Sequence, residues 1–424
     1  MRIFYPTKME PHGPSLWYLH LFGGIRRSIP SYAQGFGGLS FSHSSTAKSR
    51  GLLRRRIKER LRECAFFTVI GLALAGAVRE AKAQENLKYE ITKIVIPDPN
   101  ANFSGATHIN DYGEVVGFYG KKELWRKAFL YKNEIIKDLG KSTLYYDFKT
   151  TPIINDLGDV VVNKEASGYG RSSIYSLGKT TDINFWSRGI NNKGEVVGFF
   201  YLYSGGQTIE LIHSYEGTMY NSINDYTQIV GSWSGITGAH HAVILENRVD
   251  WTILSPDRFG EALDINNNGK TVGYFYFYGF PTPFACLWEK DLQNKWLVRQ
   301  LDTVKSTAWA INDNGQVVGC SNIAPLNDLL PENADATLYQ DGKKINLNDF
   351  LPESSEFERL ICALDINNKG QIVGYGEGRN EPGSQYAFVM TPIPQPSADL
   401  YEDGIVDFKD LAEFASQWLE SNQR

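Results

Sequence analysis

The chain has 424 residues, of which 42% are hydrophobic and 13% aromatic, and it carries a formal charge of −5 at neutral pH. This is the composition of a globular protein that can bury a sizeable core. Residues 1–83 hold 14 of the 43 basic and 4 of the 48 acidic residues, so the remainder has a formal charge of about −15. Such an acidic surface argues against nucleic acid or an anionic membrane as a partner.

The first 83 residues have the features of an export signal. A basic cluster at 54–62 precedes an apolar run from Cys64 to Val78, and Ala81-Lys82-Ala83 forms a small-residue cleavage site. The run has 15 residues, fewer than the ~20 that span a bilayer. We therefore expect a cleaved signal peptide and a mature chain that has no membrane span and is secreted or held at the cell surface or in the periplasm. Residues 1–50 fit either a misassigned start, which we favour, or a transit peptide.

Residues 84–391 repeat one phrase seven times: Ile-Asn, a turn with Gly, and a Val-rich strand that usually ends in Gly. The copies are centred on Asn110, Asn155, Asn191, Asn224, Asn266, Asn312 and Asn367. Asn and Gly favour a tight turn, so each phrase predicts a β-hairpin. Two further strand-like segments follow, such as Lys127–Tyr131 and Glu134–Gly140.

Four short strands every ~44 residues predict an all-β fold, a β-propeller of about seven four-stranded blades. The degenerate copies around Asn155 and Asn224 leave six or eight blades open. The last repeat ends after Tyr386–Met390 without an outer strand, and the first segment, Tyr89–Ile96, resembles the missing piece. We therefore expect the N-terminal strand to complete the last blade and close the ring, which leaves no exposed sheet edge there.

The phrase Ala-x-x-Ile-Asn-x-x-Gly-x-Val-Val-Gly, with later segments such as Lys127-Ala128-Phe129 and His241-Ala242-Val243, resembles the HAF repeat of exported bacterial proteins. The resemblance covers residues 85–391. It implies the fold and an extracellular location, since no activity is attached to that family.

The C-terminal residues have a different character. A Pro-rich linker, 392–398, leads into a segment, 399–424, with carboxylates at calcium-loop positions 1, 5, 9 and 12 and Gly404 at position 6. The predicted ligands are Asp399, Asp403, the position-7 residue Ile405, Asp407 and Asp410. An apolar stripe on a short helix follows, formed by Leu411, Phe414, Ala415 and Trp418.

This segment resembles one half of a type I dockerin of the planctomycete kind. The resemblance implies a calcium ion and attachment to a cohesin-like or envelope protein through Leu411, Phe414 and Trp418. Tyr401 replaces an expected ligand, which predicts weak calcium affinity. The alternative is a solvated acidic tail with a short helix.

Few residues indicate other chemistry. Cys286, Cys320 and Cys362 are odd in number and scattered, so we expect three core residues rather than disulfides or a metal site. Asn266 lies in the turn most similar to a calcium loop, which we interpret as a turn signature. No catalytic motif is present, and His241 is predicted to pack within a strand.

The sequence thus predicts an exported, non-enzymatic β-propeller that acts as a binding or cell-surface scaffold module, with polysaccharide as one candidate partner. The alternative is a carbohydrate-active enzyme, a glycoside hydrolase or lyase. Paired carboxylates in the central channel would favour the enzyme. In Tyr274–Tyr278 alternate rings must point to opposite faces, and one set could stack on sugars.

Overall fold

The structure is a computed structural model that describes residues 88–121, 125–142, 152–164, 170–211, 217–234, 238, 240–323 and 334–393. The chain divides into two compact units, Met1–Lys82 and Ala83–Arg424, and every described residue belongs to the second. The predicted signal region, the calcium ligands (Asp399, Asp403, Ile405, Asp407, Asp410) and the helix residues Leu411, Phe414 and Trp418 all lie outside the described residues. Within these ranges no helix is long and apolar enough to cross a membrane.

The described chain is built from short strands and a single 3-10 turn, η4 (Leu347–Phe350). In chain order the strands are β1 (Tyr89–Lys93), β2 (Phe103–Ile109), β3 (Val115–Lys121), β4 (Trp125–Lys132), β5 (Ile135–Lys141), β6 (Ile153–Ile154), β7 (Val160–Lys164), β8 (Arg171–Ser176), β9 (Lys179–Ile183), β10 (Gly189–Ile190), β11 (Val196–Gly198), β12 (Tyr201–Ser204), β13 (Gln207–Glu210), β14 (Thr218–Ile223), β15 (Ile229–Trp233), β16 (His241–Glu246), β17 (Asp250–Ile253), β18 (Phe259–Ile265), β19 (Thr271–Phe277), β20 (Phe280–Lys290), β21 (Trp296–Gln300), β22 (Ser306–Ile311), β23 (Val317–Ser321), β24 (Asp335–Gln340), β25 (Lys343–Asn346), β26 (Phe357–Ile366), β27 (Ile372–Gly378) and β28 (Gln385–Pro392).

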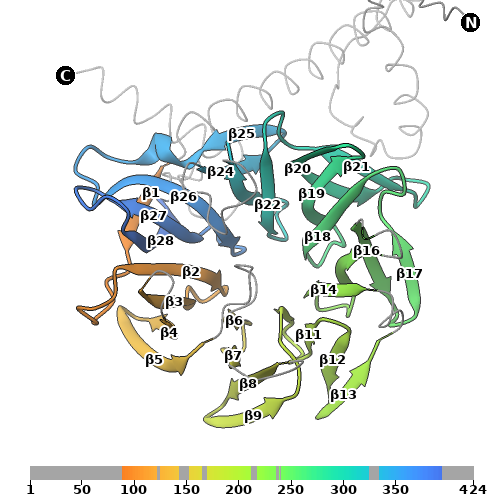
Figure 1. The fold of residues 1–424 in the computed structure, drawn as a ribbon, viewed down its shortest axis with the longest axis horizontal. Helices are drawn as coiled ribbons and strands as arrows, with labels where there is room; N and C mark the ends of the chain where they lie inside the picture. The colour runs from red at the N-terminus through yellow and green to blue at the C-terminus, as the bar shows by residue number, and fades with distance from the viewer. Residues whose placement is uncertain are drawn as a thin grey trace, which may run out of the picture. The chain divides into compact units, whose positions relative to one another are not determined.

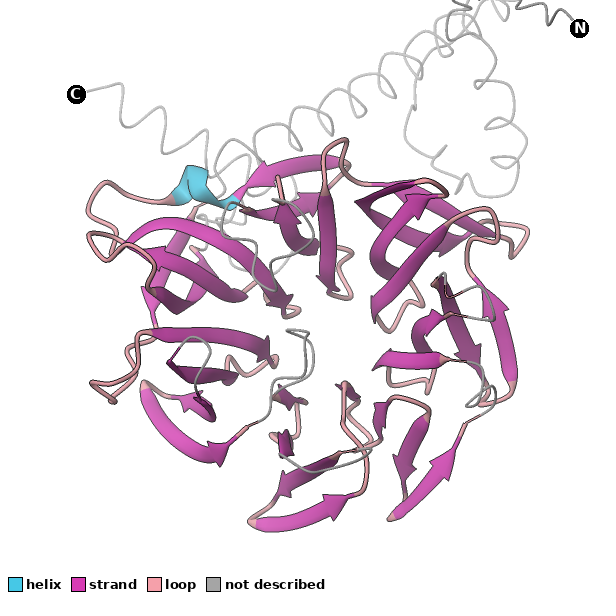
Figure 2. Cartoon of the chain, viewed as in Figure 1, coloured by secondary structure: helices cyan, strands magenta, loops and turns pink. Residues whose placement is uncertain are grey.

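These strands form small antiparallel sheets arranged around a central channel as the blades of a β-propeller (Figures 1 and 2). Five sheets have four strands each, and a sixth has eight. The eight-stranded sheet is two blades joined by one parallel pair, Phe103 with Gln385. We number the blades in chain order: blade 1 is β2–β5, blades 2 to 6 are the five separate sheets, and blade 7 is β26, β27, β28 and β1. The prediction of an all-β fold with four-stranded sheets is confirmed.

The N-terminal strand completes blade 7, as the sequence predicted. β1 pairs antiparallel with β28, from Tyr89 opposite Pro392 to Lys93 opposite Phe388. The strand is shorter than the predicted Tyr89–Ile96, although the Ile94 amide still donates to Ala387 O. The Tyr89 ring is buried and meets Phe350 edge-on, with ring centroids 5.2 Å apart. The outer edge of β28 is thereby paired.

The repeat phrase fits this architecture residue by residue. The two residues that open each second strand are Val except at Ile229, Thr271 and Ile372, and all are buried, as β-branched side chains in a packed sheet should be. The Gly that follows them in every blade except blade 2, which has Val162, leaves room for the inner strand. A Cβ atom on Gly273 would lie 2.0 Å from Glu261 O, and one on Gly231 would lie 1.9 Å from Met219 O. The Val-Val-Gly pattern therefore reports a close backbone approach.

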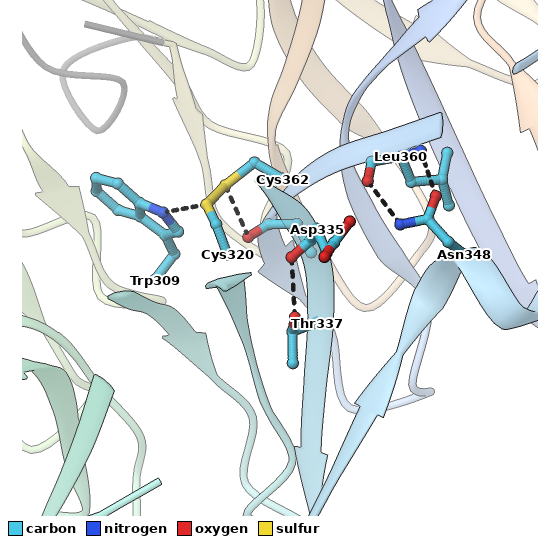
Figure 3. The surroundings of a disulfide bond; sticks show 8 residues. Trp309, Cys320, Asp335, Thr337, Asn348, Leu360 and Cys362 are labelled. Atoms are coloured by element: carbon cyan, nitrogen blue, oxygen red, sulfur yellow. Dashed lines mark hydrogen bonds between the residues drawn. A yellow bond between two sulfur atoms is a disulfide. The ribbon is translucent and has the colours of Figure 1, made fainter. Parts of the chain in front are cut away.

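One sequence prediction is wrong. Cys320 in β23 and Cys362 in β26 form a disulfide that joins blade 6 to blade 7, with their Cα atoms 4.9 Å apart (Figure 3). Both cysteines are buried, and the Trp309 indole N–H donates to the Cys320 sulfur at 3.1 Å. The two residues are 42 positions apart, so only the packing of adjacent blades brings them together. Cys286 is a buried free thiol, as predicted, and burial raises its pKa.

Candidate functional site

The seven Asn turns, six with Gly and one with Thr227 in its place, surround one end of the channel, which we call the turn end. In every blade five residues separate the inner strand from the second strand. The turn Asn is buried, and its Oδ1 accepts the backbone N–H four positions later at 2.8–3.0 Å in all seven copies. The Asn side chain therefore replaces the backbone partners that a loop would otherwise need.

The same side chains also connect the blades. Each Asn Nδ2 donates to the backbone carbonyl of the corresponding Asn in the next blade, at 2.9–3.1 Å. The sequence of donors runs Asn110, Asn155, Asn191, Asn224, Asn266, Asn312, Asn367 and back to Asn110. We call this closed circle the Asn ring. It is unidirectional and passes through the junction between blade 7 and blade 1.

A second circle lies beside it, formed by the residue after each Asn. The backbone N–H of each donates to the side-chain Oδ1 of its counterpart in the next blade at 2.8–2.9 Å. The members are Asp111, Asp156, Asn192, Asp225, Asn267, Asp313 and Asn368. Only Asp and Asn place an acceptor at this reach. Each of the three Asn side chains also donates to the Asp carboxylates on both sides.

The two circles frame a cavity of about 190 Å³ at the turn end of the channel. Its repeated lining is the Ile-Asn-Asp/Asn phrase of all seven blades. Besides Ile153 and Gly189, the non-repeated lining consists of polar side chains from blades 1, 3, 4 and 5: His108, Arg188, Asn221, Ser222 and Asp264. The repeated residues therefore form the two circles, and these exceptions to the repeat make the channel wall asymmetric.

Two of these exceptions, Arg188 and Asn221, belong to a hydrogen-bonded chain across blades 3 to 5. The Arg188 guanidinium donates to Asn221 Oδ1 at 2.5 Å, and Asn221 Nδ2 donates to Glu261 Oε1 at 3.0 Å. The Tyr274 hydroxyl donates to the other Glu261 oxygen at 3.0 Å. Arg188 and Asn221 are buried, so this chain holds a buried cation against a carboxylate through one amide.

In the turn most similar to a calcium loop, the side-chain oxygens that could bind an ion accept hydrogen bonds from neighbouring groups instead. Asp264 accepts from the Ser222 hydroxyl at 2.7 Å and from the Ile311 N–H at 3.0 Å. Asn266 holds its own turn and donates to Asn312 O. Among the described residues no group of three or more His, Cys, Asp or Glu side chains could hold a metal ion. The interpretation of the phrase as a turn signature agrees with these contacts.

Two buried carboxylates outside the channel also join neighbouring segments. Burial alone would raise the pKa of Asp302, but hydrogen bonds from Lys344, Ser321, the Val304 N–H and Tyr339 outweigh it and lower that pKa. In the same way burial opposes ionisation of Glu195. Hydrogen bonds from Thr227, Asn191 and Ser204 and the charge of Arg248 at 2.9 Å lower the pKa of Glu195. Each carboxylate stays ionised because it is paired.

The other end of the blades, the opposite end, differs from blade to blade. The connections between second and third strands vary from 2 residues in blades 3 and 5 to 13 in blade 6. The strand ends at this side of blades 4 and 5 carry a series of partly exposed rings, which we call the aromatic band: Trp233, His241, Phe259, Tyr276 and Tyr278. His241 lies within this band and its Nδ1 is 3.1 Å from Arg258 O, so it is packed in its strand as predicted.

No family model matches the chain, and neither does any curated protein. Among solved structures it is similar to the β-propeller domain of the Trilobed protease from Pyrococcus furiosus, with 12% identity, 72% of this chain and 99% of that chain covered, and a TM-score of 0.45. It is also similar to a fungal alcohol oxidase of the AA5 family in complex with copper (10%, 72% and 76%, TM-score 0.42) and to Aleuria aurantia lectin (10%, 70% and 97%, TM-score 0.31). These similarities concern the fold alone. The resemblances to the HAF repeat and to half a dockerin remain predictions.

Proposed function

We propose that the chain is an exported, non-enzymatic β-propeller that serves as a binding or cell-surface scaffold module and is tethered by its dockerin-like tail. The observation that carries this proposal is the difference between the two ends of the blades. At the turn end all seven Asn side chains and their neighbours hold one another in closed circles. At the opposite end the connections between second and third strands vary from 2 to 13 residues, as the loops of a recognition surface do.

Export is supported by the disulfide between Cys320 and Cys362. Stable disulfides form in oxidising compartments outside the cytosol. This agrees with the signal-like residues before position 84 and with the acidic remainder of the chain. The location proposed is the cell surface, the periplasm or the medium of a bacterium.

The alternative, a carbohydrate-active enzyme, draws on the five carboxylates that line the cavity: Asp111, Asp156, Asp225, Asp264 and Asp313. Each except Asp264 accepts a backbone N–H from the preceding blade at 2.8 Å, and Asp264 accepts the Ile311 N–H of the next blade at 3.0 Å. These hydrogen bonds fix each carboxylate between neighbouring blades. We therefore assign these groups to closing the ring.

The test compares the full chain with a chain that ends at Ile393, both exported by the organism that encodes them. We expect the full chain to remain with the envelope fraction in calcium and to enter the medium with EDTA or after truncation. Neither form should release reducing ends from soluble polysaccharides. An identical distribution of the two forms would remove the tether from the proposal, and release of reducing ends by the purified wild type would show an enzyme instead.

A further inference from the structure

A hairpin at the opposite end of blade 5 exposes three aromatic rings. β19 and β20 are joined by Tyr278 and Gly279, and the flanking Phe277 and Phe280 face each other across the strands. The exposed fractions are 86% for Tyr278, 72% for Phe280 and 44% for Phe277. An exposed cluster of large apolar side chains on a soluble protein indicates an interaction site.

The exposed rings stand on a rigid support. Within the aromatic band, centroid distances are 5.9 Å from Trp233 to His241, 4.9 Å from His241 to Phe259 and 6.0 Å from Phe259 to Tyr278. On the other side of the strand, Phe277 meets the buried Phe275 edge-on at 5.5 Å. The rings are therefore fixed before any ligand arrives, which lowers the entropic cost of binding.

The chemistry of the rings favours a ligand with one apolar face and hydroxyl edges. In the aromatic band the exposed Tyr278 and the partly exposed Tyr276 each carry a hydroxyl beside an apolar face, so stacking and hydrogen bonding can act together there. A pyranose ring offers the complementary pair of surfaces.

Charge favours a neutral ligand. The guanidinium of Arg258 stacks on Phe275 and Phe277, with its carbon 4.5 and 5.5 Å from the two ring centroids, and its Nε lies 3.7 Å from Asp257. The local charges thus offset each other. The chain after residue 83 carries a formal charge of about −15, which repels polyanions.

We propose that the aromatic band, together with Phe277 and Phe280, is a platform for a neutral polysaccharide. This inference rests on the proposed binding function and names its ligand class. Sugar rings stack on Tyr278, and the partly exposed rings from Tyr276 to Trp233 extend the contact across blades 4 and 5, while Phe277 and Phe280 offer a second stacking face on the other side of the hairpin.

The test is electrophoresis of the full exported chain in native gels that contain hydroxyethylcellulose, galactomannan, laminarin or the polyanion alginate. The variant is Tyr278→Ala with Phe280→Ala. The matched control is Tyr226→Ala, which removes a Tyr of 71% exposure from the turn end. All these side chains are exposed, so equal melting temperatures are expected and should be checked.

We expect at least one neutral polysaccharide to retard both the wild type and the control. The double variant should bind that polysaccharide at least about tenfold more weakly. Three results would overturn the inference: no retardation by any neutral polysaccharide, equal retardation of wild type and double variant, or retardation by alginate alone. A dimer that sediments as a monomer after the double substitution would also overturn it, because the surface would then bind a second copy. The envelope-retention experiment uses no added polysaccharide, so its result tests the proposed function independently of polysaccharide binding.

Discussion

The substitution Asn367→Asp tests the junction between blade 7 and blade 1. The Asn367 amide is 4% exposed, and its Nδ2 donates to Asn110 O and to Gln371 Oε1, both at 2.9 Å. Its Oδ1 accepts from the N–H groups of Lys369 and Gln371. Aspartate keeps the accepted bonds but places a second oxygen against two acceptors, so the change removes both donations, including the one that closes the Asn ring.

Each buried polar group left without its partner costs about 1–3 kcal/mol, and more when a charge is involved. We therefore expect Asn367→Asp to lower the free energy of unfolding by about 2–4 kcal/mol, measured by urea denaturation followed through tryptophan fluorescence. The matched control is Asn294→Asp, an exposed residue at the tip of the β20–β21 turn, which should change stability by less than about 0.5 kcal/mol. Equal stabilities of the two variants would refute the view that the Asn ring holds the blades together.

Three further predictions follow from buried groups. A thiol reagent should modify no cysteine of the folded exported chain, only Cys286 after unfolding without reductant, and three cysteines after unfolding with reductant. Replacing Cys320 and Cys362 by Ser should lower the free energy of unfolding by about 2–4 kcal/mol. Because Glu195 has a lowered pKa, its stabilising contribution is present at neutral pH and is lost as the pH falls through its folded-state value, so Glu195→Gln should flatten the acid side of a stability-against-pH curve. Gly273→Ala should lower stability by about 1–3 kcal/mol, since its methyl group would overlap Glu261 O, and an unchanged thermal midpoint would contradict the close approach.

Much of the ring of blades could be predicted from the sequence because each hairpin is specified by residues that lie close together in the chain. A turn that needs Asn and Gly, and a strand of Val residues, specify a hairpin wherever they occur. The missing outer strand of the last repeat likewise predicted the pairing of β1 with β28. In β19 the alternation of Tyr276 and Phe277 to opposite sides followed from strand geometry.

The contacts between blades were not predictable in the same way. Cys320 and Cys362 meet because β23 and β26 belong to adjacent blades, and an odd number of cysteines argued against any pair. The polar channel wall, with Arg188 against Asn221, likewise depends on which blades are neighbours. One signal was visible in the sequence: the residue after each repeat Asn is Asp or Asn in all seven copies, which is the requirement of the second circle.

Hydrogen exchange of the β1 amides tests the central claim, that the N-terminal strand and the Asn ring close seven blades around one channel. In the exported chain, the backbone amides of Thr92 and Ile94, which face β28, should be protected as strongly as those in β27 and β28, because they lie on the hydrogen-bonded side of β1 in the same sheet. Exchange of residues 88–94 at the rate of a free peptide, with β27 and β28 still protected, would contradict the account.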